Sequence, residues 1–241
     1  MKRIIISLLA VAGTVWATTA WATPPSLTPG KGKGIVIIQL ERKSDAPSLD
    51  MMWNLRAAWF DAAAGKPYVE NAPTRSDTGF GVYAAPSGRY YMVARANAGR
   101  SVFTQFEAMV QWKMCLDGGS YAFSVPEDRY TYLGRLDPRP AQRRINGAVQ
   151  SGLLLAYPNR NTLMTGRLDG FVPAGDAAEL AQVQKDISGM YEKAVEVTAG
   201  DAAPETFETA LVPEKDGAMV KACWAWSSKD TRPQGFNGFR E

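Results

Sequence analysis

The chain has 241 residues, with 27 lysines and arginines, 24 aspartates and glutamates, and no histidine. The absence of histidine excludes Ser-His-Asp and Cys-His catalysis and removes the ligand that most zinc sites use. The formal net charge is +3, far from the concentrated basic charge of nucleic-acid-binding proteins, so no nucleic-acid partner is expected.

Residues 1–22 have the three parts of a secretory signal peptide. Lys2 and Arg3 precede the apolar run "IIISLLAVAGTVWA", and "AWA" ending at Ala22 is a small-x-small cleavage site. We predict cleavage after Ala22, a periplasmic or secreted protein, and no transmembrane segment once the signal is removed; the alternative is an uncleaved anchor. Cleavage would lower the net charge from +3 to +1, because Lys2 and Arg3 leave with the signal. Residues 23–34, rich in proline, glycine and lysine, predict a flexible leader.

Residues 35–137 predict the core of an antiparallel β-sandwich, and the chain as a whole is expected to be mainly β. "GIVIIQLER" and "NLRAAWFDAAAGKPY" are typical of strands, and "GFGVYAAPSGRYYMVARA" predicts a hairpin with a type I turn at Pro86-Ser87-Gly88. "FEAMVQW" (106–112) predicts one amphipathic strand, and "MCLDGGSYAFSV" predicts a strand pair around Asp117-Gly118-Gly119. The residues expected to be buried in this core are Tyr90, Met92, Phe106, Val110, Trp112 and Phe123.

Two adjacent tyrosines raise the question of a stacking platform for a ring-shaped ligand. Side chains alternate across a strand, so Tyr90 is expected in the core and Tyr91 on the face that carries Arg89 and Arg95. The tyrosines therefore cannot form one platform. We take Tyr91, Arg89, Arg95 and Arg135 as candidate binding residues; the alternative for Tyr91 is a half-buried tyrosine of an ordinary sheet.

The pattern Pro-x-x-Arg-Tyr occurs at 86–90 and again at 126–130, which suggests two similar hairpins. The stretches "VYAAPSGRYYMVARA" and "CLDGGSYAFSVPEDRYTYLGRL" resemble a loose group of exported bacterial proteins of unknown function with a transthyretin-like β-sandwich. The positions that match its pattern are Phe123, Val125, Tyr132, Leu133 and Gly134, whereas Asp128 stands where the pattern has glycine and Arg135 where it has Gly-Asp. The resemblance implies an exported β-sandwich and carries no catalytic residues.

Residues 138–228 are expected to add strands and one helix that complete the sandwich or are appended to it. "DPRPAQRRINGAVQSG" predicts a linker or long loop. Arg135, just before it, and Arg139, Arg143 and Arg144 within it form a basic group that is solvated or meets anionic glycans or lipid headgroups. "LLLAYPNRNTLMTGRLDGF" allows one or two strands. An apolar stripe predicts an amphipathic helix over about 176–197, docked on the sandwich or binding a partner, with a capping-box-like start at Asp176 and Glu179. "AMVKACWAWSS" predicts a last strand, and 229–241 a loose tail.

Cys115 and Cys223 are the two cysteines, and in an oxidising compartment we predict that they form a disulfide; the alternative is two buried thiols. Asp77-Thr78-Gly79 has the letters of an aspartic-protease loop, but Thr74-Arg75-Ser76 replace the apolar residues that precede that motif.

No catalytic residue, metal site or cofactor is predicted. The favoured function is a non-enzymatic, envelope-associated or ligand-binding module, with an envelope protein or a glycan as partner. The alternative is a histidine-free hydrolase, glycosidase or aspartic-protease-like, that works through a carboxylate pair about 5–10 Å apart.

Overall fold

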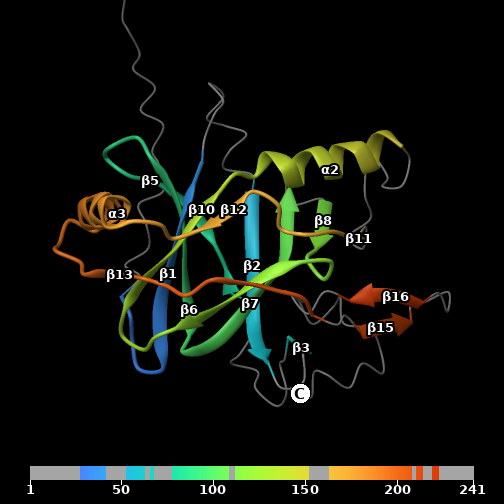
Figure 1. Ribbon diagram of the computed structural model, residues 1–241, viewed down its shortest axis with the longest axis horizontal. Helices are drawn as coiled ribbons and strands as arrows, with labels where there is room; N and C mark the ends of the chain where they lie inside the picture. Colours follow the sequence, from blue (N-terminus) through green and yellow to red (C-terminus); the bar gives the residue numbers. More distant parts are fainter. Residues whose placement is uncertain are drawn as a thin grey trace, which may run out of the picture.

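The computed structural model describes residues 28–41, 53–62, 66–67, 78–108, 112–151, 163–207, 210–213 and 219–222. In these residues the chain is mainly β, with two packed sheets and the helices α2 (Arg139–Gln150) and α3 (Ala177–Met190), as Figure 1 shows. This confirms the predicted fold class, a β-sandwich with a helix docked on it. The predicted signal peptide with its cleavage site, and the predicted tail from 229, lie outside the described residues.

The first sheet has the order β12-β10-β1-β6-β5. Its strands are β12 (Phe171–Pro173), β10 (Tyr130–Leu136), β1 (Lys33–Leu40), β6 (Tyr90–Asn97) and β5 (Gly81–Ala84), and β13 (Val197–Ala199) also pairs with β10. Most strand pairs among the described residues are antiparallel, but β10 is parallel to both β1 and β13, and β11 is parallel to β8 of the second sheet. The apolar run Ile35–Ile38 of β1 is completely buried, which is expected of a central strand covered on both faces.

The second sheet is built around β7 (Gly99–Ala108). On one side of β7 lies β2 (Trp53–Asp61); on the other side lie β8 (Trp112–Cys115) and β9 (Ser120–Val125), one after the other along the same edge. The outer members are β3 (Lys66–Pro67), β4 (Thr78–Gly79), β11 (Leu163–Thr165) and β14 (Ala203–Glu205), and β15 (Ala210–Pro213) pairs separately with β16 (Met219–Ala222). The predicted pairing of β8 with β9 around Asp117–Gly119 is therefore wrong.

The single strand expected over 106–112 is also wrong, because β7 ends at Ala108 and β8 begins at Trp112. Ala108 pairs with Trp112 across an antiparallel hairpin. Residues directly opposite each other in such a pair lie on the same face of the sheet. The alternation of apolar residues therefore continues from one strand into the next, and a periodicity argument does not detect the hairpin.

The two Pro-x-x-Arg-Tyr segments make similar turns that have different consequences. In the first, Gly88 has φ +82° and its N–H donates to the Ala85 carbonyl, and the turn joins the paired strands β5 and β6 as predicted. In the second, Asp128 occupies the equivalent position with φ +55°, a conformation that glycine adopts more readily than other residues do. This turn joins β9 of the second sheet to β10 of the first, so the predicted second hairpin is wrong.

The core between the two sheets contains the residues that the strand alternation predicts. Tyr90, Met92, Phe106 and Phe123 are buried there, which confirms four of the six predicted core residues. The side chains of Val110 and Trp112 lie outside the described residues. Phe103 packs against Phe123 with ring centroids 4.6 Å apart.

The loop predicted over 137–152 is wrong, because most of it forms α2. Ala141, Ile145 and Ala148 recur at helical spacing and are buried against the core between the sheets. At the helix start, the Asp137 carboxylate accepts from the N–H of Arg139 at 3.1 Å. Two of the three buried residues are alanines among arginines and glutamines, so the apolar stripe is weak in the sequence.

A second apolar cluster lies on the other face of the first sheet, under α3. The start of this helix is confirmed: the Asp176 side chain accepts from the N–H of Glu179, and Glu179 in turn accepts from the N–H of Gly175. The helix ends at Met190, so the predicted extension to 197 is wrong. The reversal follows at Glu192, which has φ +52° and cannot continue a right-handed helix.

Candidate functional site

Polar side chains gather at one end of the first sheet, on the face that α3 covers. Arg135 of β10, Gln39 of β1 and Tyr91 of β6 lie in register across three neighbouring strands. Glu41 and Arg89 lie two residues further toward the same end, and therefore on the same face. Side chains of α3 complete this group.

Tyr91 and Asp186 form the first contact between the sheet and the helix. The Tyr91 hydroxyl donates to Asp186 Oδ2 at 2.7 Å, and Gln182 Nε2 donates to Oδ1 at 3.0 Å. The Arg89 guanidinium lies 3.4 Å from Oδ2. Asp186 is only 3% exposed, and a buried carboxylate is tolerated when it is hydrogen-bonded and paired in this way.

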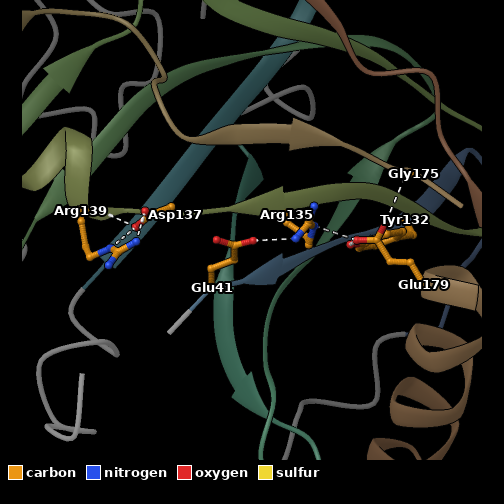
Figure 2. Close-up of polar contacts among 7 residues, drawn as sticks. All are labelled: Glu41, Tyr132, Arg135, Asp137, Arg139, Gly175 and Glu179. Carbon is orange, nitrogen blue, oxygen red and sulfur yellow. Dashed lines mark hydrogen bonds and ion pairs between the residues drawn. The ribbon is translucent and has the colours of Figure 1, made fainter. Parts of the chain in front are cut away.

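Tyr132 and Glu179 form the second contact, two helical turns earlier on α3. The Tyr132 hydroxyl donates to Glu179 Oε1 at 2.7 Å, and Arg135 Nε forms an ion pair with the same oxygen at 3.1 Å. Arg135 also donates through a terminal nitrogen to Glu41 Oε1 at 2.8 Å. Figure 2 shows Arg135 between the carboxylates of Glu41 and Glu179, and the Arg139–Asp137 pair beyond Glu41.

Both tyrosines are held in the neutral, hydrogen-donating form. Burial raises the pKa of Tyr91 well above its ordinary value, and the hydrogen bond to the Asp186 carboxylate raises it further. Burial and the hydrogen bond to Glu179 raise the pKa of Tyr132 in the same way. At neutral pH both hydroxyls therefore remain donors to carboxylates of the helix.

We expect alkaline pH to destabilise the protein through these two tyrosines. A group whose pKa is raised by folding contributes its full stability below the unfolded-state pKa, here 10.0, and loses it as the pH rises above that value. Well above pH 10 each tyrosine costs about 1.4 kcal/mol per pH unit. Between pH 10 and 11, where the unfolded tyrosines go from half to mostly ionised, the free energy of unfolding should fall by about 2 kcal/mol.

Urea unfolding at a series of pH values measures this loss, and tyrosinate absorbance follows the ionisation. The double variant Tyr91→Phe/Tyr132→Phe is the control, because it should have a shallower dependence above pH 10. Equal slopes for the variant and the wild type would contradict the prediction.

Three of the four predicted binding residues come together here and one does not. Arg89, Tyr91 and Arg135 all contribute to the group, whereas Arg95 lies toward the other end of β6, where its guanidinium packs near Gly30. Tyr91 is 0% exposed, so both the exposed stacking residue and the half-buried alternative are wrong. The cause is α3, which covers the face of the sheet that the alternation assigned to solvent.

Sequence reasoning missed Asp186 as a functional residue and identified Glu179 only as a helix cap. A signal was present: Asp186 lies on the apolar stripe of α3 beside Val183, Ile187 and Met190, all of which are buried. A charged residue at the centre of a buried stripe requires a partner from another element.

The basic group around α2 is ordered by ion pairs. Arg139 pairs with Asp137 and Arg144 with Asp169, while Arg143 is exposed and has no ion pair among the described residues. The hydrogen bond from Arg139 lowers the pKa of Asp137. The loop predicted for these arginines is therefore wrong, whereas their predicted exposure to solvent is not contradicted: the side chains of Arg139 and Arg144 are 41% and 38% exposed.

Two other sequence features are only partly covered by the described residues. Of Asp77-Thr78-Gly79, the last two residues form β4, which pairs with β2. Cys115 is completely buried at the end of β8, whereas Cys223 lies outside the described residues, so the disulfide stays a prediction.

In the part of the chain that the structure describes, no helix is long and apolar enough to cross a membrane. Within the same residues, no three His, Cys, Asp or Glu side chains are grouped so that they could hold a metal ion. No protein-family model, curated protein or solved structure matches this chain. The resemblance to exported transthyretin-like proteins therefore stays a prediction.

Proposed function

We propose that this chain is an exported, non-enzymatic binding module of the periplasm or the extracellular space. Its binding surface in this proposal is the charged strip, which we define as Arg89, Glu41, Arg135, Asp137 and Arg139. The observation that carries the proposal concerns Arg89 and Arg135, whose side chains are 44% and 40% exposed. Each of them nevertheless forms an ion pair with a carboxylate of α3: Arg89 with Asp186, and Arg135 with Glu179.

Fixed guanidinium groups favour binding because less side-chain freedom is lost when a partner arrives. Arginine also presents several donors in a rigid plane, so hydrogen bonds remain available after one carboxylate is engaged. The ion pairs of Arg89 and Arg135 with the carboxylates of α3 therefore support a role in recognition for the exposed sides of these two arginines.

A protein partner suits the charged strip better than a glycan, a lipid or a nucleic acid does. The charged strip carries three positive and two negative side chains, which fits a partner that carries both signs of charge. The stacking contact to a sugar for which Tyr91 was a candidate is absent, because Tyr91 is buried. We therefore propose an envelope protein as the partner.

Among the residues that the structure describes, the two carboxylates of α3 do not favour the hydrolase alternative. Glu179 and Asp186 are seven residues apart on one helix, so their Cα atoms are separated by roughly 10 Å. Each accepts a hydrogen bond from a buried tyrosine and lies beside an arginine. In our proposal these carboxylates position the arginines and do not form a catalytic pair.

Site-specific photocrosslinking in the producing cells tests the proposal. A crosslinker at Val172, which is exposed and pairs with Arg135 across β12 and β10, should capture a defined envelope protein. The same group at the exposed residue Lys31 should not capture it. N-terminal sequencing of the envelope fraction should also find Thr23 as the first residue.

The captured protein, once purified, provides the quantitative test. Arg135→Gln should raise its Kd by about 10-fold or more, whereas Arg143→Gln, an equal change of charge at an exposed site on α2, should raise it less than about 2-fold. Equal effects of the two variants, or identical capture from Val172 and Lys31, would contradict the proposal.

A further inference from the structure

We propose that residues 174–196, which contain α3, form a lid over the first sheet that opens as a unit while the two sheets stay packed. The proposal goes beyond the binding function and does not depend on it. It rests on how the lid is attached, on what it buries and on the chemistry of its contacts.

The lid is attached at both ends to a single strand. β12 precedes it and pairs with residues 134–136 of β10, and β13 follows it and pairs with residues 130–132 of the same strand. Figure 1 shows α3 to one side of the sheet between these two attachments. The helix can therefore move away from the sheet without breaking the ladders that join β10, β1 and β6.

The lid covers an apolar cluster that is separate from the main core and that includes Ile35, Ile37 and Tyr132 of the first sheet. Only four residues of α3 are buried, Val183, Asp186, Ile187 and Met190. The three apolar ones belong to the cluster under the helix, and the first sheet separates this cluster from the core between the sheets. Opening the lid would consequently remove none of the apolar residues that hold the two sheets together.

The contacts under the lid are also unusual for a permanently docked helix. Asp186 loses its hydration in the closed state and is compensated by Tyr91, Gln182 and Arg89. In the open state its carboxylate regains water, so part of the cost of burial is recovered. An apolar residue at this position would gain nothing from water, and the helix would be harder to release.

Opening the lid would also uncover polar groups that lie between α3 and the charged strip. The hydroxyls of Tyr91 and Tyr132 and the inner sides of Arg89 and Arg135 face α3 in the closed state. Opening would free both arginines from their helix carboxylates. The lid would thus decide whether the two guanidinium groups are fixed or mobile.

Native-state hydrogen exchange of the purified mature protein tests the lid directly. The amides of α3 should exchange through one common opening that is faster than the opening of β1 and β7. Tyr91→Phe removes the donor to Asp186 and should speed exchange in α3 by about 10-fold to 100-fold. Exchange in β7 should be unchanged.

Tyr90→Phe is the matched control, because Tyr90 is the neighbouring residue on β6 but faces the core between the sheets. It should not speed α3 selectively. Tyr132→Phe is a second test at the other contact and should reproduce the effect of Tyr91→Phe. The proposal is wrong if α3 and β7 exchange together in the wild type, or if Tyr91→Phe speeds both equally.

Discussion

Replacing Gly134 with alanine is expected to lower the free energy of unfolding by about 3–5 kcal/mol. Gly134 has φ +136°, a conformation that alanine rarely adopts. An added Cβ would also lie 2.1 Å from the carbonyl oxygen of Val172 and 2.7 Å from the carbonyl carbon of Pro173. Both atoms are backbone atoms of β12, so no flexible side chain can give way.

The position of Gly134 in the sheet explains why the effect should be large. The register between β1 and β10 shifts between Ile37 and Ile38, and Gly134 is the first residue of β10 after the shift. Gly134 also pairs with Pro173 at the start of the β12 ladder. Alanine would force β12 away from β10, and α3 is connected to the sheet through β12.

Urea unfolding followed by circular dichroism measures the effect. Gly147→Ala is the control, because Gly147 lies exposed within α2 and an added Cβ would meet nothing within 4 Å. This change should stabilise the protein by about 0.5–1 kcal/mol, since alanine is the better helix former. A Gly134→Ala variant within about 1 kcal/mol of the wild type would contradict the clash that we describe.

Reduction of the predicted Cys115–Cys223 bond is expected to lower the free energy of unfolding by about 4–5 kcal/mol. A bond between these residues would close a loop of the order of 100 residues, and the chain-entropy model assigns such a loop a stabilisation of that size. Cys115 is completely buried at the end of β8, and Cys223 directly follows β16 in the sequence. The bond would connect the C-terminal strands to the second sheet.

Mass spectrometry of unreduced peptides should find the two cysteines linked, and unfolding with and without reductant gives the energy. The double variant Cys115→Ala/Cys223→Ala should be insensitive to reductant and should have a stability close to that of the reduced wild type. Recovery of two free thiols from the protein purified without reductant from its native source would overturn the prediction.

Local patterns predicted much of the framework of this protein. The β-branched run of β1, the hairpin of β5 and β6, and the opposite faces of Tyr90 and Tyr91 were all predicted correctly. The start of α3 at Asp176 was predicted from a cap that spans three residues. Each of these features depends on neighbours in the sequence, through alternation, turn chemistry or capping.

The candidate site depended on contacts that no local pattern contains. Tyr91 and Asp186 are 95 residues apart in the sequence, and Tyr132 and Glu179 are 47 apart. Alternation placed Tyr91 opposite the core, but whether that face meets water or a helix depends on where a distant segment packs.

The turn at 126–129 likewise combines a local conformation, which the sequence predicts, with a strand pairing that depends on distant residues. Its residues specify a turn much like the one at 86–88, including a positive φ at the same position. Whether such a turn closes a hairpin or carries the chain to the other sheet depends on which strand has an available edge, and here β10 pairs with β1, about 95 residues earlier in the chain. The sequence by itself therefore determined several of the strands, the turns at 85–88 and 126–129, the start of α3, and which face of a strand a side chain lies on. Only the tertiary structure decided which strands pair and which polar groups are buried together, because these depend on burial and hydrogen bonding between residues far apart in the chain.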